Sequence, residues 1–215
     1  MNVLEELENF INEFNALNDE DFSIDTIRIE FSKQHKLEHL KKLGNWNKLQ
    51  KNSNILHKLK KRLAVDEVTS AYRLEKQDIY YYNSNVDAPK YRKAILVIFG
   101  MRQYHKDPPP RVVISNILQI LKDVSSIDIC IDLPYKPNLE TLGMKYRLTP
   151  YYDTSYINDT DIPMLDKIVF YNKGYKNNLK RTLWRIEAMI SIPNFRDLIL
   201  PLHEFKEIID ITRSV

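Results

Sequence analysis

Two acidic side chains on one strand are the first feature of this sequence that could do chemistry. Residues 126–132 read SIDICID, in which apolar and polar residues alternate. Because successive side chains of a strand point to opposite faces, Asp128, Cys130 and Asp132 share one face and the isoleucines share the other. The acidic face is either the solvated side of a sheet or one wall of a site.

Two tyrosines follow on later strand candidates. Residues 155–158 form a short candidate that includes Tyr156, within an irregular stretch with several prolines. Residues 167–173 read as a strand that carries Tyr171 and Lys173. A tyrosine in so apolar a run also fits simple packing, so the sequence leaves both roles open for Tyr171.

The last strand candidate, residues 182–192, alternates almost without error. Its apolar side chains face one way, while Arg185 and Glu187 face the other. The pair is either a solvated ion pair or part of a functional face. Together, these strands can direct their polar side chains into one cleft.

Carboxylates from different strands are the oxygen ligands that Mg²⁺ or Mn²⁺ prefers. Asp128 and Asp132 lie four residues apart, which puts their Cα atoms about 13 Å apart on a straight strand. They cannot both bind one ion directly unless the strand bends, so another ligand is needed, and Glu187 is the candidate. The five histidines are scattered without an HxH pair, which argues against a histidine metal site.

The order and spacing of these motifs resemble the replication initiation factor family. That family includes the trans-acting initiators of rolling-circle plasmids, RstA-like replication proteins of filamentous phages and related relaxases. The resemblance rests on Ile-Asp-Ile-Cys-Ile-Asp (127–132), Thr-Ser-Tyr-Ile (154–157), Ile-Val-Phe-Tyr-Asn-Lys (168–173) and Leu-Trp-Arg-Ile-Glu (183–187). The chain departs from the family pattern at Ser126, Asn158 and Asn172, where arginine, glycine and aspartate are usual.

The resemblance implies an α+β fold with a mainly antiparallel sheet, a ferredoxin-like core related to the HUH endonucleases, and helices on one face. It also implies a DNA replication initiator that nicks one strand of origin DNA through a tyrosine, leaving a 5′-phosphotyrosine and a free 3′-hydroxyl. Single-stranded or cruciform origin DNA is the implied partner, and a homodimer and a host helicase are further partners that it allows. The implied roles are nucleophile for Tyr156 or, second, Tyr171; metal ligand for Asp128, Asp132 and Glu187; and phosphate contact for Lys173 and Arg185.

A lysine-rich stretch near the N-terminus is the second candidate surface. From Lys33 to Arg62 the chain has ten basic residues and one acid, Glu38. Such a local field attracts polyanions, although a solvated helix face that only confers solubility has the same composition. The candidate DNA-contacting residues are Lys41, Lys42, Lys58, Lys60, Lys61 and Arg62. The nearby run Tyr80-Tyr81-Tyr82 fits either base stacking or packing on both faces of a strand.

The composition is that of a globular protein, with 43% hydrophobic and 28% charged residues over 215 positions. A net charge of +3 does not by itself identify a nucleic-acid binder. No apolar run is long enough for a membrane span and the N-terminus lacks signal-peptide features, so we expect a cytoplasmic protein. The single cysteine, Cys130, excludes an intramolecular disulfide and fits a reducing compartment.

We expect one domain over residues 1–215. It would comprise an N-terminal helix (1–20), a sheet core (24–192) and a C-terminal helix (194–211). Three functions stay open: a tyrosine nicking enzyme, a catalytically inactive DNA-binding protein on the same fold, and a protein-interaction subunit.

Overall fold

The computed structural model describes residues 2–63, 70–83, 93–192 and 195–213. These residues group into two compact units. The first unit comprises Met1–Glu6, Thr26–Met101 and Pro108–Ser125, and the second comprises Leu7–Asp25, Arg102–Asp107 and Ser126–Val215. The single domain predicted for residues 1–215 stays a prediction.

The first unit is an antiparallel sheet with helices. Its strands follow the order β2-β3-β4-β5-β1, and each neighbouring pair is antiparallel. The elements are β1 (Ser23–Ser32), α2 (Lys33–Lys41), β2 (Trp46–Lys48), α3 (Asn54–Leu63), β3 (Ala71–Leu74), β4 (Ile79–Asn83), β5 (Lys93–Ile98) and α4 (Arg111–Ile120). The lysine-rich stretch therefore forms two helices, and the short strand β2 between them was not predicted.

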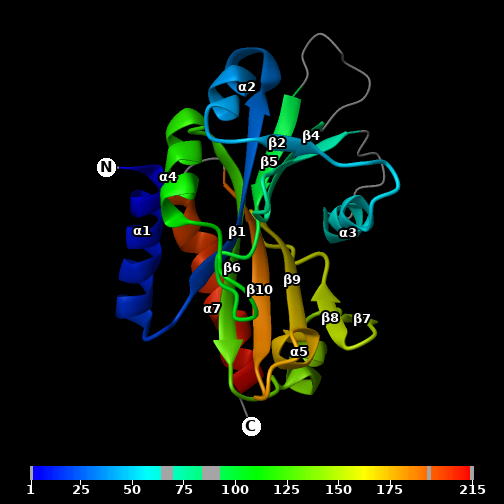
Figure 1. Ribbon diagram of the computed structural model, residues 1–215. Helices are drawn as coiled ribbons and strands as arrows, with labels where there is room; N and C mark the ends of the chain where they lie inside the picture. Colours follow the sequence, from blue (N-terminus) through cyan, green and yellow to red (C-terminus); the bar gives the residue numbers. More distant parts are fainter. Residues whose placement is uncertain (1, 64–69, 84–92, 193–194, 214–215) are drawn as a thin grey trace. The chain divides into compact units, whose positions relative to one another are not determined.

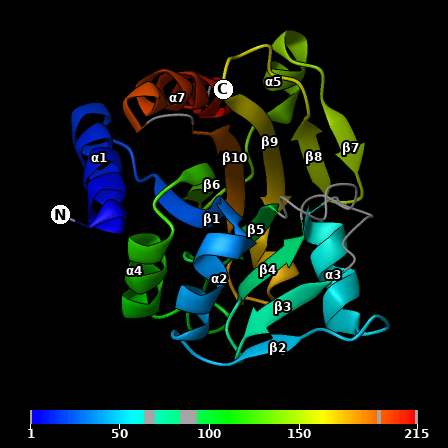
Figure 2. The same cartoon turned by 90° about the horizontal axis from the view of Figure 1, so that it is seen from above.

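Tyrosines of β4 are buried on both faces of this sheet. Tyr80 and Tyr82 lie in one apolar cluster with Leu56 and Leu59 of α3, whereas the ring of Tyr81 packs against Trp46, Tyr72 and Phe31. Figure 2 shows α3 on one side of β3 and β4, and α2 and α4 on the other. The tyrosine run is therefore used for packing, and the helices of this unit cover both faces of the sheet rather than one.

The second unit contains the other five strands, in the order β6-β10-β9-β8-β7 (Figure 1). All neighbouring pairs are again antiparallel. The elements are α1 (Val3–Asn18, from Leu7 onward), β6 (Val124–Leu133), α5 (Leu139–Lys145), β7 (Thr149–Tyr151), β8 (Thr154–Ile157), β9 (Leu165–Asn172), α6 (Lys173–Lys176), β10 (Trp184–Ser191), a 3₁₀ turn (Phe195–Leu198) and α7 (Ile199–Arg213).

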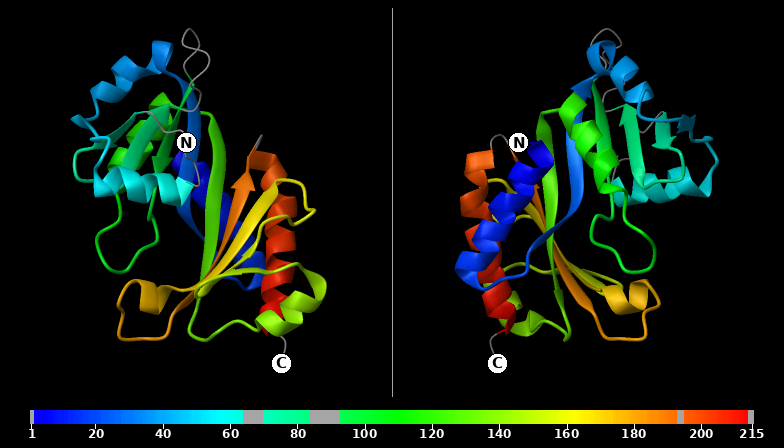
Figure 3. Two further views of the ribbon diagram at one scale, coloured as in Figure 1. Left: turned by 90° about the vertical axis from the view of Figure 1, so that its right-hand side faces the viewer. Right: turned by 60° about the vertical axis from the view of Figure 1, so that its left-hand side comes forward.

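The core of the second unit lies between its sheet and α7, which packs along β10 (Figure 3). The isoleucines of β6 and Ile186, Ala188 and Ile190 of β10 are buried, as their alternation predicts, while Trp184 at the start of β10 is half-buried. Phe22 packs against both α1 and α7: its ring centroid lies 5.8 Å from that of Phe14 in α1 and 5.1 Å from that of Phe205 in α7. With α7 on the apolar face, the polar face carries the candidate site.

The predicted α+β fold with a mainly antiparallel sheet is confirmed. So are the helix at each end of the chain and the strands predicted around residues 126–132, 155–158, 167–173 and 182–192. Within the described ranges, no helix combines the length and the apolar character needed to cross a membrane.

Candidate functional site

The polar face of the second unit's sheet holds most of the predicted catalytic and metal-binding residues. In an antiparallel pair, residues directly opposite each other share a face, so the strand register shows which side chains meet. Three rows cross this face: Asp132, Arg185, Tyr171 and Thr154; Cys130, Glu187, Val169 and Tyr156; and Asp128, Met189 and Lys167. The register thus places both acids of β6, both tyrosines and the Arg185–Glu187 pair on one side of one sheet.

Arg185 is the centre of a buried ion-pair network. Its Nε and Nη2 donate to the two carboxylate oxygens of Asp132 at 2.6 and 2.7 Å, and its Nη1 donates to Asp25 at 2.8 Å. The Arg185 side chain is fully buried, and the carboxylates are 3% and 5% exposed. Burial alone would raise the pKa of Asp132, but the hydrogen bonds and charge of Arg185 outweigh it and lower that pKa.

Asp132 has further partners in the segment that follows β5 in the chain. The hydroxyl of Tyr104 donates to its Oδ2 at 2.7 Å, and Nε of Arg102 lies 3.2 Å from the same oxygen. Arg102 in turn donates to Asp21 at 2.7 Å and to the hydroxyl of Ser23. The network therefore ties this segment, the start of β1 and β10 to one carboxylate.

Three residues of this network, Asp25, Arg102 and Tyr104, were not predicted from the sequence as site residues. The sequence does contain a sign of the role of Asp25, because the alternation of the strand places it on the same face as the buried Ile27, Ile29 and Phe31. An acid in an apolar register needs a buried cation as its partner. Arg102 and Tyr104 lie in an irregular segment, where no periodicity marks them.

Tyr171 is paired with Glu187. The phenol hydroxyl of Tyr171 donates to Oε2 of Glu187 at 3.0 Å, and only 8% of Tyr171 is exposed. Burial, and then the charge of Glu187, raise the pKa of Tyr171. Burial, and then the charges of Asp25 and Asp128, raise the pKa of Glu187 to about 7. A protonated phenol thus faces a carboxyl group that titrates near neutral pH.

Tyr156 lies farther from these groups. It is opposite Val169, which is opposite Glu187, so its Cα is two strand spacings, about 10 Å, from that of Glu187. Its ring is half-buried, with Nζ of Lys167 4.6 Å from the ring centroid. The structure brings Tyr171, and not Tyr156, into contact with a carboxylate.

Lys173 begins α6 and is buried. Its Nζ donates to the backbone oxygen of Arg102 at 3.3 Å, and 6% of the residue is exposed. Burial, and then the positive charge of Arg185, lower the pKa of Lys173. The predicted phosphate contacts of Lys173 and Arg185 stay predictions.

The predicted metal ligands do not fit one ion. Among the residues that the structure describes, no three acidic, histidine or cysteine side chains are grouped so as to hold a metal. Asp128 is opposite Met189 and Asp132 is opposite Arg185, four residues apart along β6. Both oxygens of Asp132 accept hydrogen bonds from Arg185. The Mg²⁺ or Mn²⁺ prediction stays a prediction.

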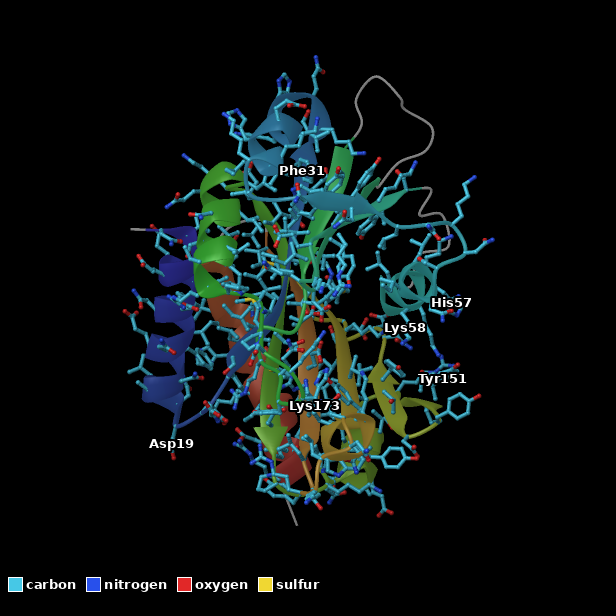
Figure 4. All side chains as sticks on the ribbon, in the orientation of Figure 1. Asp19, Phe31, His57, Lys58, Tyr151 and Lys173 are labelled. Atoms are coloured by element: carbon cyan, nitrogen blue, oxygen red, sulfur yellow. The ribbon has the colours of Figure 1, made fainter. Side chains whose placement is uncertain are left out.

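The predicted DNA-contacting lysines lie on α2 and α3 of the first unit and at the residue after α2. Lys41, Lys42, Lys58 and Lys61 are exposed and Lys60 is half-buried; Figure 4 shows Lys58 next to His57 on α3. Lys41 forms an ion pair with Glu38 at 2.5 Å. The side chain of Arg62 lies outside the described residues.

Comparison with known proteins gives a likeness of fold. No protein-family model and no curated protein sequence matches this chain. The structure is similar to that of the rolling circle replication initiator protein from Geobacillus stearothermophilus, with a TM-score of 0.43 and 11% sequence identity over 84% of this chain and 78% of that one.

Proposed function

We propose that this protein binds DNA in the initiation of replication, and that the lysines of α2 and α3 contact the phosphate backbone. The observation that carries the proposal is the two-sided character of α3. Leu56 and Leu59 are each 4% exposed in the apolar cluster of the first unit, while His57, Lys58 and Lys61 are exposed. Packing fixes the helix and leaves its basic side to solvent.

The segment that contains α2 and α3 is strongly basic in sequence. Residues 33–61 include nine lysines, and their one acid, Glu38, is paired with Lys41. Lysines that neutralise phosphates release counterions, so the logarithm of the binding constant falls with the logarithm of salt concentration by about 0.9 per duplex phosphate contact. A surface of this kind binds nucleic acid with an affinity that depends strongly on salt.

Salt-dependent binding tests the proposal. Fluorescence anisotropy would follow a labelled DNA duplex binding to the wild type, to Lys58→Ala/Lys61→Ala, and to the control Lys122→Ala/Lys145→Ala, whose lysines are also exposed. We expect the first variant to reduce the salt slope by about 2 and the control to leave it unchanged. Equal slopes for both variants would refute the assignment to α3. No binding by the wild type at moderate salt would refute DNA binding and favour a protein-interaction role.

The contact between Tyr171 and Glu187 favours a second, catalytic function, in which Tyr171 cleaves one DNA strand. The phenol oxygen would attack the phosphorus and the bond from phosphorus to the 3′ oxygen would break, leaving a 5′-phosphotyrosine and a 3′-hydroxyl. The phenol proton would pass to Glu187, and the leaving oxygen would take up a proton. Burial keeps the phenol protonated, so a carboxylate within hydrogen-bonding distance supplies the acceptor that the reaction needs.

Nicking of a supercoiled plasmid that carries the cognate origin separates the two functions. The wild type, Tyr171→Phe and Tyr156→Phe would each be incubated with Mg²⁺, with Mn²⁺ or with EDTA, and covalent adducts would be detected on denaturing gels. Loss of the adduct in Tyr171→Phe alone is expected for Tyr171 as nucleophile. Loss in Tyr156→Phe alone would transfer that role to Tyr156. A wild type that binds the origin and forms no adduct under any condition is the inactive DNA-binding protein.

A further inference from the structure

The connection between β9 and β10, residues 173–182, is a basic surface segment that we call the α6 loop. It contains Lys173, Lys176, Lys180 and Arg181, and residues 167–186 include no acid. Figure 3 shows the loop at one end of β9 and β10, on the side of these strands away from α7. The loop therefore belongs to the polar side of the second unit, which carries the candidate site.

Hydrogen bonds fix the backbone of the α6 loop. The amide of Gly174 donates to the oxygen of Leu183 and the amide of Leu179 donates to the oxygen of Gly174, each at 2.8 Å. The side chain of Asn172 accepts from the amide of Tyr175 at 2.8 Å and caps α6. A Cβ on Gly174 would lie 2.5 Å from the backbone oxygen of Arg181. A backbone held this tightly needs little further ordering when a ligand binds, which lowers the entropic cost of binding.

An aromatic ring and three cations of this loop are exposed. Tyr175 is 77% exposed, and Lys176, Lys180 and Arg181 are also exposed. An aromatic side chain placed among cations in a fixed loop is the combination that binds unpaired bases: the ring stacks on a base and the cations contact the phosphates. Cations alone would bind a duplex equally well, whereas the open face of Tyr175 can stack only on a base outside a duplex.

Two of these cations also contact the tyrosines of the candidate site. Nζ of Lys176 lies 4.4 Å from the ring centroid of Tyr171, and the guanidinium carbon of Arg181 lies 5.2 Å from that of Tyr104. Tyr171 donates to Glu187 and Tyr104 donates to Asp132. A strand bound along the α6 loop would therefore lie beside both hydrogen-bonded tyrosines.

We propose that the α6 loop binds single-stranded nucleic acid, with Tyr175 stacked on an unpaired base and Lys176, Lys180 and Arg181 contacting the adjacent phosphates. This proposal rests on the DNA binding proposed above. It adds that the bound nucleic acid is single-stranded and that it binds at the α6 loop. It makes the second unit a single-strand site, in addition to the phosphate-contacting surface on α2 and α3 of the first unit.

The test compares a labelled oligothymidylate with a labelled hairpin duplex in anisotropy titrations. Tyr175→Ala should weaken binding of the oligothymidylate by about 5- to 100-fold and leave duplex binding unchanged, and Tyr175→Phe should retain wild-type binding because the ring is kept. Lys180→Ala/Arg181→Ala should lower the salt slope on the single strand by about 1.4. Tyr152→Ala is the matched control, because Tyr152 is 90% exposed outside the loop.

Each contrary result has its own meaning. Suppose that the wild type binds both duplex and single strand. If Tyr175→Ala then weakens neither, or weakens both only as much as Tyr152→Ala does, the α6 loop is not the single-strand site. The proposed phosphate contacts of the lysines on α2 and α3 would be unaffected by that result. If a labelled acidic peptide binds the loop and is displaced by polyglutamate but not by DNA, the ligand of the loop is an acidic protein segment, and the inference is overturned. If the wild type binds neither form of DNA at moderate salt, the proposed function itself fails.

Discussion

Replacing Arg185 with leucine tests how the second unit is held together. The substitution replaces the guanidinium with an apolar side chain that still fills part of the space. It removes all three hydrogen bonds from the guanidinium to Asp25 and Asp132. These carboxylates are 5% and 3% exposed, so water cannot take the place of the guanidinium without opening the site. Removing one partner of a buried ion pair costs about 3 to 5 kcal/mol. Here both buried carboxylates lose the charge of Arg185, while Tyr104 and Arg102 still contact Asp132.

The expected loss is large relative to the whole stability of a domain, which is about 5 to 15 kcal/mol. Urea unfolding followed by tryptophan fluorescence would measure it, since Trp184 is the neighbour of Arg185 in β10. Arg147→Leu is the control, because Arg147 is exposed and a surface substitution changes stability by less than about 0.5 kcal/mol. A loss of less than about 1 kcal/mol in Arg185→Leu would refute the reasoning.

A second substitution separates charge from packing. In the wild type, Asp25→Asn should destabilise the protein, because it weakens the bond to Arg185. In the Arg185→Leu background the same change should restore stability, because it neutralises a buried carboxylate that has lost the positive charge of Arg185. If Asp25→Asn destabilises both backgrounds equally, the cost of Arg185→Leu comes from packing and not from charge.

Two further predictions concern the candidate site. Burial raises the pKa of Glu187 from 4.5 to about 7, so the stability that its protonated form contributes is fully present below pH 4.5 and is lost as the pH rises through 7. Glu187→Gln should therefore reduce the change in unfolding free energy between these pH values by up to about 3 kcal/mol in urea titrations; an unchanged profile would contradict the assignment. Gly174→Ala should destabilise the protein by about 1 to 3 kcal/mol and weaken oligothymidylate binding, because the added Cβ would meet the oxygen of Arg181 at 2.5 Å. Gly143→Ala, whose Cβ would be 3.6 Å from Leu148, is its control in both assays.

The sequence by itself determined several of the elements and the faces of their strands. Alternation is a local property, so residues 126–132 alone were enough to put Asp128 and Asp132 opposite to the isoleucines, and residues 182–192 to put Arg185 and Glu187 on one face. It also predicted that Asp128 and Asp132, about 13 Å apart on a straight strand, cannot both bind one ion directly unless the strand bends. Both conclusions follow from the geometry of a single strand.

Only the tertiary structure decided which of these side chains meet. Asp25 and Arg185 are 160 residues apart, and their contact depends on how the start of β1 is placed against β10, which no local pattern encodes. The same holds for Tyr104 on Asp132 and for the choice of Tyr171 over Tyr156 as the partner of Glu187, since the register of β8, β9 and β10 fixes those distances. Pairing partners are selected by register and by the cost of burying an unpaired charge, and both exist only in the folded chain.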